Sequence, residues 1–138
     1  MSFTVTPHLN FRGQARAALE FYQGVFGGDL VVMTYGQMGQ GSGAEADRVI
    51  WGQVASPDGF RVMAFDVLEP RPYDPGRNAF FVSVRGDSPA ELQARWEALS
   101  QDATVLHPLG PAPWTALYGM LTDRFGVTWI LDLEPAAA

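Results

Sequence analysis

Alternating and helical spacings of apolar residues divide the first part of the chain into four strands and a helix. Residues 3–11 alternate between apolar and polar side chains, which predicts a strand with His8 on its more polar face. Residues 14–26 instead repeat apolar positions at helical spacing, and two glycines follow, as expected of an amphipathic helix and its stop. Three further strands, two of them joined by a Ser-Pro-Asp-Gly turn, are predicted over residues 30–35, 49–55 and 60–67.

The same order of elements recurs in the second part of the chain. Residues 79–84 form an apolar, strand-like run, and a capping box at residues 88–91 begins a helix that runs to about residue 99. A short strand and a closing hairpin complete this part, with strands predicted over residues 104–106, 116–121 and 127–132. Each part is therefore predicted to be a β-α-β-β-β module.

This internal repeat predicts the architecture. Hairpin corners at Gly59 and Gly126 occupy equivalent places in the two modules, which supports the repeat independently of the order of elements. A lone module would leave one sheet face uncovered, so we expect both modules to form a curled mixed sheet around a cleft, in the α+β class. The predicted organisation is a single domain over residues 1–138, with modules at 3–68 and 79–133 and a proline-rich linker at 69–78.

Composition excludes several classes of function. The net charge is −6, from 9 Lys+Arg against 15 Asp+Glu, and the arginines are scattered, so a nucleic-acid partner is not expected. Without cysteine, the chain has no disulfide, thiolate zinc site or cysteine nucleophile. No signal peptide or membrane-spanning run is found, so we expect no membrane association and a cytoplasmic protein. Rossmann, P-loop and G-x-S-x-G motifs are also missing.

Aromatic residues are the main candidates for a binding site. Trp51, Trp114, Tyr118, Met120 and Trp129 form either a box for an apolar or planar ligand or plain core packing. Trp114 favours the binding alternative because it lies in a loop of prolines at the mouth of the predicted cleft.

The polar candidates are fewer. His8 is a general base, a metal ligand or a hydrogen-bonded strand residue. His107 is interpreted as a surface residue, and Asp123 as the cap of its turn. The glycine-rich residues 36–47 are a surface loop or a lid over a site.

Several segments resemble a known superfamily along nearly the whole chain. They are TPHLNF at residues 6–11, ALEFY at 18–22, VFGG at 25–28, Trp114, and YGMLTDRFGVTW at 118–129. The chain resembles the vicinal oxygen chelate superfamily, which includes glyoxalases, bleomycin-resistance proteins and dioxygenases. More narrowly it resembles the PhnB-like branch, whose members are also labelled 3-demethylubiquinone 3-methyltransferase-like. The resemblance implies a glyoxalase-like fold and, because modules of this fold commonly complete one another across chains, a homodimer.

In metal-using members, the resemblance implies ligands from the first and last strands of each half. Carried over to this chain, those positions are His8, Met63, Phe80 or Phe81, and Ile130, and Trp51 stands where the branch often has histidine. Apolar side chains do not bind a hard or borderline cation. Metal chemistry would therefore require a ligand recruited from another register, such as Gln53, Asp132 or Glu134.

The sequence thus predicts a metal-free, PhnB-like protein that binds an apolar or planar small molecule in an aromatic cleft, without a cofactor. Its acidic character would favour a cationic or planar ligand. The alternatives are a divalent-metal-dependent lyase, isomerase or dioxygenase that uses His8, and a structural remnant without a site. The predicted ligand-binding residues are His8, Trp51, Gln53, Met63, Trp114, Tyr118, Met120 and Ile130.

Overall fold

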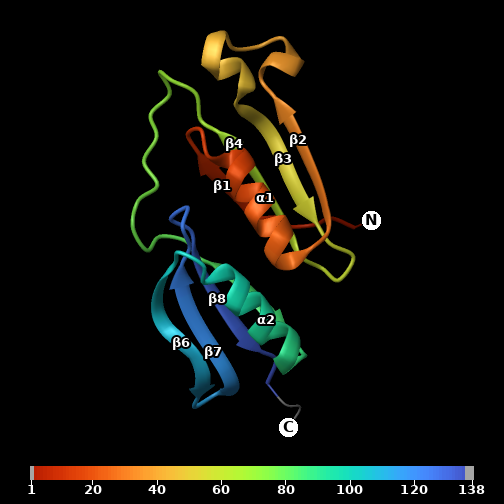
Figure 1. Ribbon diagram of the computed structural model, residues 1–138, viewed down its shortest axis with the longest axis vertical. Helices are drawn as coiled ribbons and strands as arrows, with labels where there is room; N and C mark the ends of the chain where they lie inside the picture. The colour runs from red at the N-terminus through yellow and green to blue at the C-terminus, as the bar shows by residue number, and fades with distance from the viewer. Residues whose placement is uncertain (1, 136–138) are drawn as a thin grey trace. The chain divides into compact units, whose positions relative to one another are not determined.

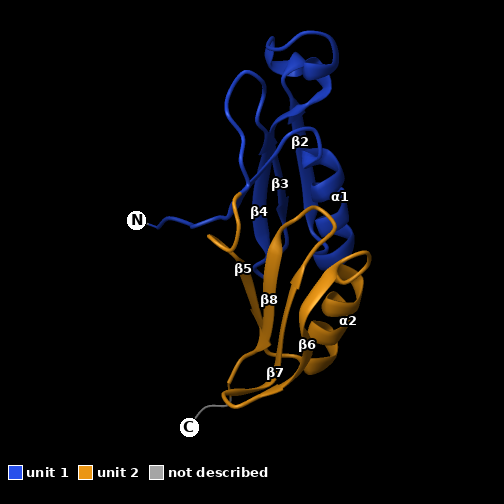
Figure 2. Cartoon of the chain, turned by 90° about the vertical axis from the view of Figure 1, so that its left-hand side faces the viewer, with its two compact units in different colours: residues 1–75 blue, residues 76–138 orange. Residues whose placement is uncertain are grey.

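Each half of the chain folds into a four-stranded mixed sheet with one helix packed on one face (Figure 1). The computed structural model describes residues 2–135, which divide into two units, with the boundary between residues 75 and 76 (Figure 2). The α+β class and the two βαβββ modules predicted from the sequence are confirmed. The single domain and the shared cleft stay predictions.

Unit 1 has the strand order β1-β4-β3-β2, with β1 parallel to β4 and the other pairs antiparallel. The parallel pair is possible because α1 crosses from β1 back over the sheet. Its elements are β1 (His8–Phe11), α1 (Ala15–Phe26), β2 (Asp29–Thr34), two short 3-10 turns (Gly36–Met38 and Gly43–Asp47), β3 (Val49–Ala55) and β4 (Arg61–Asp66).

Unit 2 repeats this topology with the strand order β5-β8-β7-β6, and β5 runs parallel to β8. Its elements are β5 (Val82–Gly86), α2 (Pro89–Leu99), β6 (Thr104–Ala112), β7 (Thr115–Thr122) and β8 (Thr128–Leu133). Ser88 caps α2 as its motif predicts, because its hydroxyl accepts a hydrogen bond from the backbone N–H of Glu91.

The core of each unit lies between its helix and its sheet. The buried residues of α1 are those that the helical spacing predicts, and α2 likewise buries apolar residues at helical spacing. In unit 1 they are Ala15, Ala18, Leu19, Tyr22, Val25 and Phe26; in unit 2 they are Leu92, Trp96 and Leu99. Glycine lets the helix approach the sheet: at Gly52 an added Cβ would collide with Leu19, and at Gly119 it would lie 2.7 Å from the Trp96 ring.

A buried carboxylate joins three segments of unit 1. Asp66 ends β4 with only 1% of its surface exposed, and it accepts hydrogen bonds from the backbone N–H groups of Gly13, Ala15 and Val49 at 2.7, 3.1 and 2.9 Å. The backbone carbonyl of Asp66 accepts a further bond from the Tyr35 hydroxyl at 2.6 Å. Asp66 therefore fixes the start of α1 and the start of β3 against β4.

Four predicted bounds were wrong. The first strand begins at His8, and Phe3 and Val5 before it are 89% and 87% exposed. Strand β5 begins at Val82 rather than at residue 79, and it ends at Gly86 rather than at residue 84. The segment 36–47, predicted as a loop, also contains two short 3-10 turns.

The fourth error concerns β6, which extends through residues predicted as a proline loop. It tolerates its prolines because it is an edge strand whose pairing with β7 shifts at three places. Among residues 2–135, no helix is long and apolar enough to cross a bilayer.

Candidate functional site

In unit 1, strand alternation places the candidate residues on the sheet face opposite α1. Val62, Ala64 and Asp66 are buried, whereas the intervening Met63 and Phe65 are half-buried and point to the other side. We call this side the helix-free face of unit 1; the residues that share it are His8, Asn10, Trp51, Gln53, Met63 and Phe65. Pairing puts His8, Met63 and Gln53 in one row across β1, β4 and β3.

His8 is the titratable candidate on this face. Its ring is exposed and lies edge-on to Phe65, with 5.2 Å between the ring centroids. The Nδ1–H donates to Asn10 Oδ1 at 2.9 Å, in the tautomer that this carbonyl oxygen requires. That tautomer leaves Nε2 as the basic nitrogen. His8 is thus a hydrogen-bonded strand residue whose Nε2 lone pair can still accept a hydrogen bond or bind a metal.

In unit 2, the helix-free face carries a cluster of aromatic rings. Tyr118 on β7 contacts two rings edge-to-face: His107 on β6, at 5.2 Å between centroids, and Trp114 in the β6–β7 turn, at 5.3 Å. Trp114 is 58% exposed, although it is held by this contact. Ile130 pairs with Met120 in the neighbouring row and lies on the same face. The rings of Tyr118, His107 and Trp114 therefore lie together on this face.

An ion pair lies in the same row as Tyr118. Asp132 on β8 pairs with Arg85 on one side and with Tyr118 on the other. The guanidinium donates from Nε to Oδ1 at 3.1 Å and from Nη2 to Oδ2 at 2.8 Å. The hydrogen bond and then the charge of Asp132 raise the pKa of Arg85 above its usual value. The result is a fixed cation whose side chain is 55% exposed, in the same row as Tyr118 but two strands away from it.

The residues at the positions suggested for a metal do not fit one within either unit. Met63 faces His8 in unit 1, and Ile130 faces Ser83 in unit 2, so Ser83 is the equivalent of His8. This corrects the placement at Phe80 or Phe81, which precede β5 because that strand begins three residues later than predicted. Unit 1 offers one imidazole and a thioether, and unit 2 offers a serine hydroxyl and an isoleucine, and neither pair makes a divalent site. Within residues 2–135, no group of three or more His, Cys, Asp or Glu side chains is placed to hold a metal.

The eight predicted ligand-binding residues divide between the units. His8, Trp51, Gln53 and Met63 share the helix-free face of unit 1, and Tyr118, Met120 and Ile130 share that of unit 2, where Trp114 contacts Tyr118. Their role in binding stays a prediction.

Trp129 does not belong to either group. It is fully buried on the helix side, and its Nε1–H donates to Asp123 Oδ2 at 2.8 Å. Asp123 caps its turn as predicted, since its Oδ1 accepts from the backbone N–H groups of Phe125 and Val127.

Two features of the helix-free faces were missed by the sequence interpretation. His107 is exposed as predicted, but its ring contacts Tyr118 and is part of the aromatic cluster, at a point where the register between β6 and β7 shifts. The ion pair between Arg85 and Asp132 was also missed. The repeat offered a signal for it, because the first and last strands of a βαβββ module are parallel neighbours.

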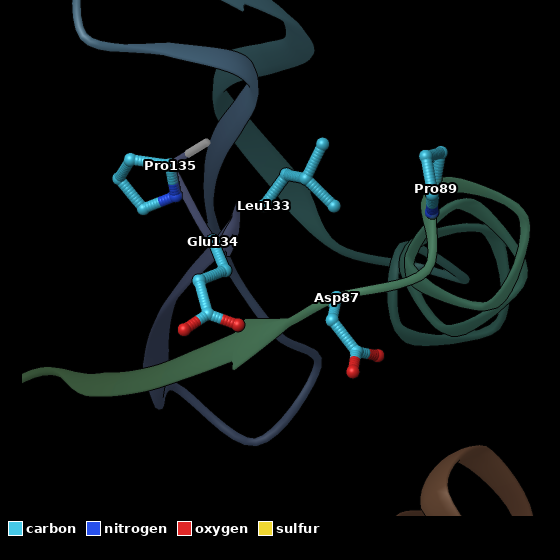
Figure 3. A pocket seen from close by; sticks show the side chains of 5 residues that line it. All are labelled: Asp87, Pro89, Leu133, Glu134 and Pro135. Atoms are coloured by element: carbon cyan, nitrogen blue, oxygen red, sulfur yellow. The ribbon is translucent and has the colours of Figure 1, made fainter. Parts of the chain in front are cut away.

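A separate depression lies at the end of β8 and the start of α2 (Figure 3). Its volume is about 530 Å³, it is open to solvent, and it contains none of the predicted ligand-binding residues. Its lining consists of two carboxylates and three apolar side chains: Asp87, Glu134, Pro89, Leu133 and Pro135.

Two βαβββ units with candidate side chains on their helix-free faces define an α+β protein of the glyoxalase-like type. The chain belongs to the glyoxalase/bleomycin resistance protein/dioxygenase superfamily, whose family model matches residues 7–131. The resemblance seen in the sequence is thereby confirmed.

Individual relatives agree with this assignment. Protein YjdN of Escherichia coli K12 is 23% identical over 139 residues, which cover 94% of each chain. The crystal structure of PA1353 from Pseudomonas aeruginosa is 33% identical, with a TM-score of 0.87 over 96% of this chain and 98% of that one. The PhnB protein of Bacillus cereus, whose name carries a 3-demethylubiquinone-9 3-methyltransferase label, is 27% identical, with a TM-score of 0.70 over 96% and 100% of the two chains.

Proposed function

We propose that this chain is a PhnB-like protein that binds an apolar or planar small molecule through the helix-free faces of its sheets, without a catalytic metal. The observation that supports binding most strongly is the ring cluster of Trp114, Tyr118 and His107. A tryptophan that is more than half exposed yet held edge-to-face leaves one large apolar surface in contact with water. Covering that surface with a flat ligand is favourable, and the contact with Tyr118 positions the Trp114 ring before the ligand binds.

The donor chemistry of the same faces supports the absence of a metal. His8 is accompanied in its row by the thioether of Met63 and the amide of Gln53. These side chains suit the edge or face of an organic ligand better than a divalent cation, which requires several nitrogen or carboxylate ligands. The proposed binding mode therefore uses His8 as a hydrogen-bonding group through Nε2.

A thermal-shift screen of planar aromatic compounds tests the proposal. Compounds that bind should stabilise the full-length chain against thermal unfolding. Trp114→Ala should lower their affinity about tenfold because one stacking surface is lost. Phe80→Ala is the matched control, since Phe80 is 93% exposed and does not belong to the ring cluster. Hits that are indifferent to Trp114→Ala, or equally weakened by the control, would contradict this location of the site.

We also propose that the protein forms a homodimer. The segment before β1 alternates apolar and polar residues and leaves Phe3 and Val5 almost fully exposed. Large apolar side chains at this exposure are typical of surfaces that another chain covers. Sedimentation velocity should give a dimer that Phe3→Ser/Val5→Ser dissociates, and a monomer at micromolar concentration for the wild type would contradict the proposal. The cytoplasmic location stays a prediction.

A further inference from the structure

The helix-free face of unit 2 presents a cation whose orientation is fixed. Arg85 is held through Nε and Nη2 by the two carboxylate oxygens of Asp132, which is only 6% exposed. These two hydrogen bonds use two of the five N–H donors of a guanidinium. The remaining donors lie on a side chain that is 55% exposed. A carboxylate-held arginine of this kind loses little further entropy when it binds a second planar acceptor.

The aromatic cluster lies at a defined distance from this cation. Arg85 and Tyr118 pair with Asp132 from opposite sides, so they lie in one row on strands β5 and β7, which flank β8. Two strand spacings separate their backbones by roughly 10 Å. Trp114 extends the ring surface beyond Tyr118. A two-ring aromatic acid is about long enough to contact the rings at one end and the guanidinium at the other.

The geometry points to an aromatic carboxylate as the ligand class, with its rings against Tyr118 and Trp114 and its carboxylate on the free N–H groups of Arg85. This inference rests on the proposed function and specifies the ligand for that face. It differs from the cationic ligand expected from the net charge of −6, because Arg85 supplies a positively charged donor in the row of Tyr118. The negative charge of Glu134 also acts on Arg85. It limits the preference for an anionic ligand, but it leaves the free N–H groups of the guanidinium in place.

Two matched probes test the inference on the full-length chain. Naphthalene-2-carboxylate and its neutral amide, naphthalene-2-carboxamide, present the same rings with and without the charge. Titrations followed by calorimetry should show the carboxylate binding about fivefold to tenfold more tightly, as expected of a charge-assisted hydrogen bond. Arg85→Gln should abolish this preference and leave the affinity for the amide unchanged. Arg16→Gln, the same change of charge on the exposed side of α1, should preserve the preference.

Further variants separate the role of Arg85 from folding. Arg85→Gln leaves Asp132 buried without its partner, which is destabilising. The double variant Arg85→Gln/Asp132→Asn removes both charges and should lose the preference in the same way. Asp132→Asn alone keeps the cation and removes the charge that offsets it, so the preference for the carboxylate should persist or rise.

The results also distinguish this inference from the proposed function. Equal binding of the two probes by the wild type, or a preference that survives both Arg85 variants, overturns the anion site. If Trp114→Ala still weakens both probes in that case, binding on this face stands. Binding of neither naphthalene compound overturns the inference, and the library screen with Trp114→Ala tests the proposed function separately.

Discussion

The two units match on the side that faces the helix and differ on the side that does not. Toward the helix, both central strands carry a glycine under a large side chain, Gly52 under Leu19 and Gly119 under Trp96. On the helix-free face, His8 and Met63 of unit 1 correspond to Ser83 and Ile130 of unit 2. Close packing therefore constrains one side, while the other side is available for different chemistry.

The divergence also assigns different roles to the two faces. Unit 1 offers an imidazole with amide and thioether neighbours, and unit 2 offers rings beside a fixed ion pair. Buried carboxylates serve the backbone in both units, Asp66 in unit 1 and Asp123 in unit 2. Asp132 differs because it orients the exposed Arg85.

Removing Asp66 should have the largest effect on stability. Asp66→Ala leaves three backbone N–H groups of unit 1 without their acceptor, and the free energy of unfolding should fall by about 3 kcal/mol or more. Urea denaturation provides the measurement. Asp58→Ala, in an exposed turn of the same unit, is the control and should change stability by less than about 0.5 kcal/mol. A loss below about 1 kcal/mol for Asp66→Ala would refute the anchoring role.

The two close-approach glycines should differ in their tolerance. In Gly119→Ala the added Cβ meets the rigid Trp96 ring at 2.7 Å and Leu109 Cα at 3.1 Å, so we expect a loss of about 2 kcal/mol. In Gly52→Ala the nearest atom is the flexible end of Leu19, which can rotate, so the loss should be about half as large. Denaturant titration of both variants measures the two losses of stability. A larger loss for Gly52→Ala than for Gly119→Ala would contradict the view that the Trp96 ring tolerates an added Cβ less well than the Leu19 side chain.

Alkaline destabilisation should arise from unit 1. Burial, and next the charge of Asp66, raises the pKa of Tyr35 above its usual value of 10.0. Burial likewise raises the pKa of Tyr73. A raised folded-state pKa stabilises the fold below pH 10, and this contribution is lost as the pH rises through the folded value. The free energy of unfolding should therefore fall above about pH 10, and less steeply in Tyr35→Phe. An unchanged slope in that variant would contradict the assignment, and Tyr118→Phe in unit 2 is the control.

His8→Ala should have the smallest effect on stability. The side chain is exposed, and it contributes one exposed hydrogen bond to Asn10 and one edge contact to Phe65. We expect a change of about 0.5 kcal/mol, measured by thermal unfolding. A loss above about 2 kcal/mol would show that His8 is a structural residue of unit 1 rather than a ligand-facing one.

Much of this fold could be predicted because the helix-facing pattern is strongly periodic. The buried residues of α1 and the capping box of α2 follow from local spacing and local hydrogen bonding. The length of β1 could not be predicted, because Phe3 and Val5 alternate like a strand but have no paired neighbour within unit 1. The extent of β6 was hidden by prolines that an irregular edge strand accommodates.

The candidate site was predictable in its residue types and less so in its contacts. Tyr118, Met120 and Ile130 share a face because strand alternation is local. The pairing of Arg85 with Asp132 depends on a parallel contact between strands 47 residues apart, which no local pattern encodes. The position equivalent to His8 was placed at Phe80 or Phe81 instead of Ser83 for a related reason, since the start of β5 is set by its pairing with β8 and not by the apolar run before it.

The most direct test of the central claim is the metal content of the purified protein combined with divalent-ion titration. We expect well below one equivalent of Zn²⁺, Mn²⁺, Ni²⁺ or Fe²⁺ per chain, and no thermal stabilisation by these ions that depends on His8, because its row supplies a single imidazole. About one equivalent of bound metal, with stabilisation that disappears in His8→Ala, would contradict the account and restore metal-dependent catalysis as the function of this fold.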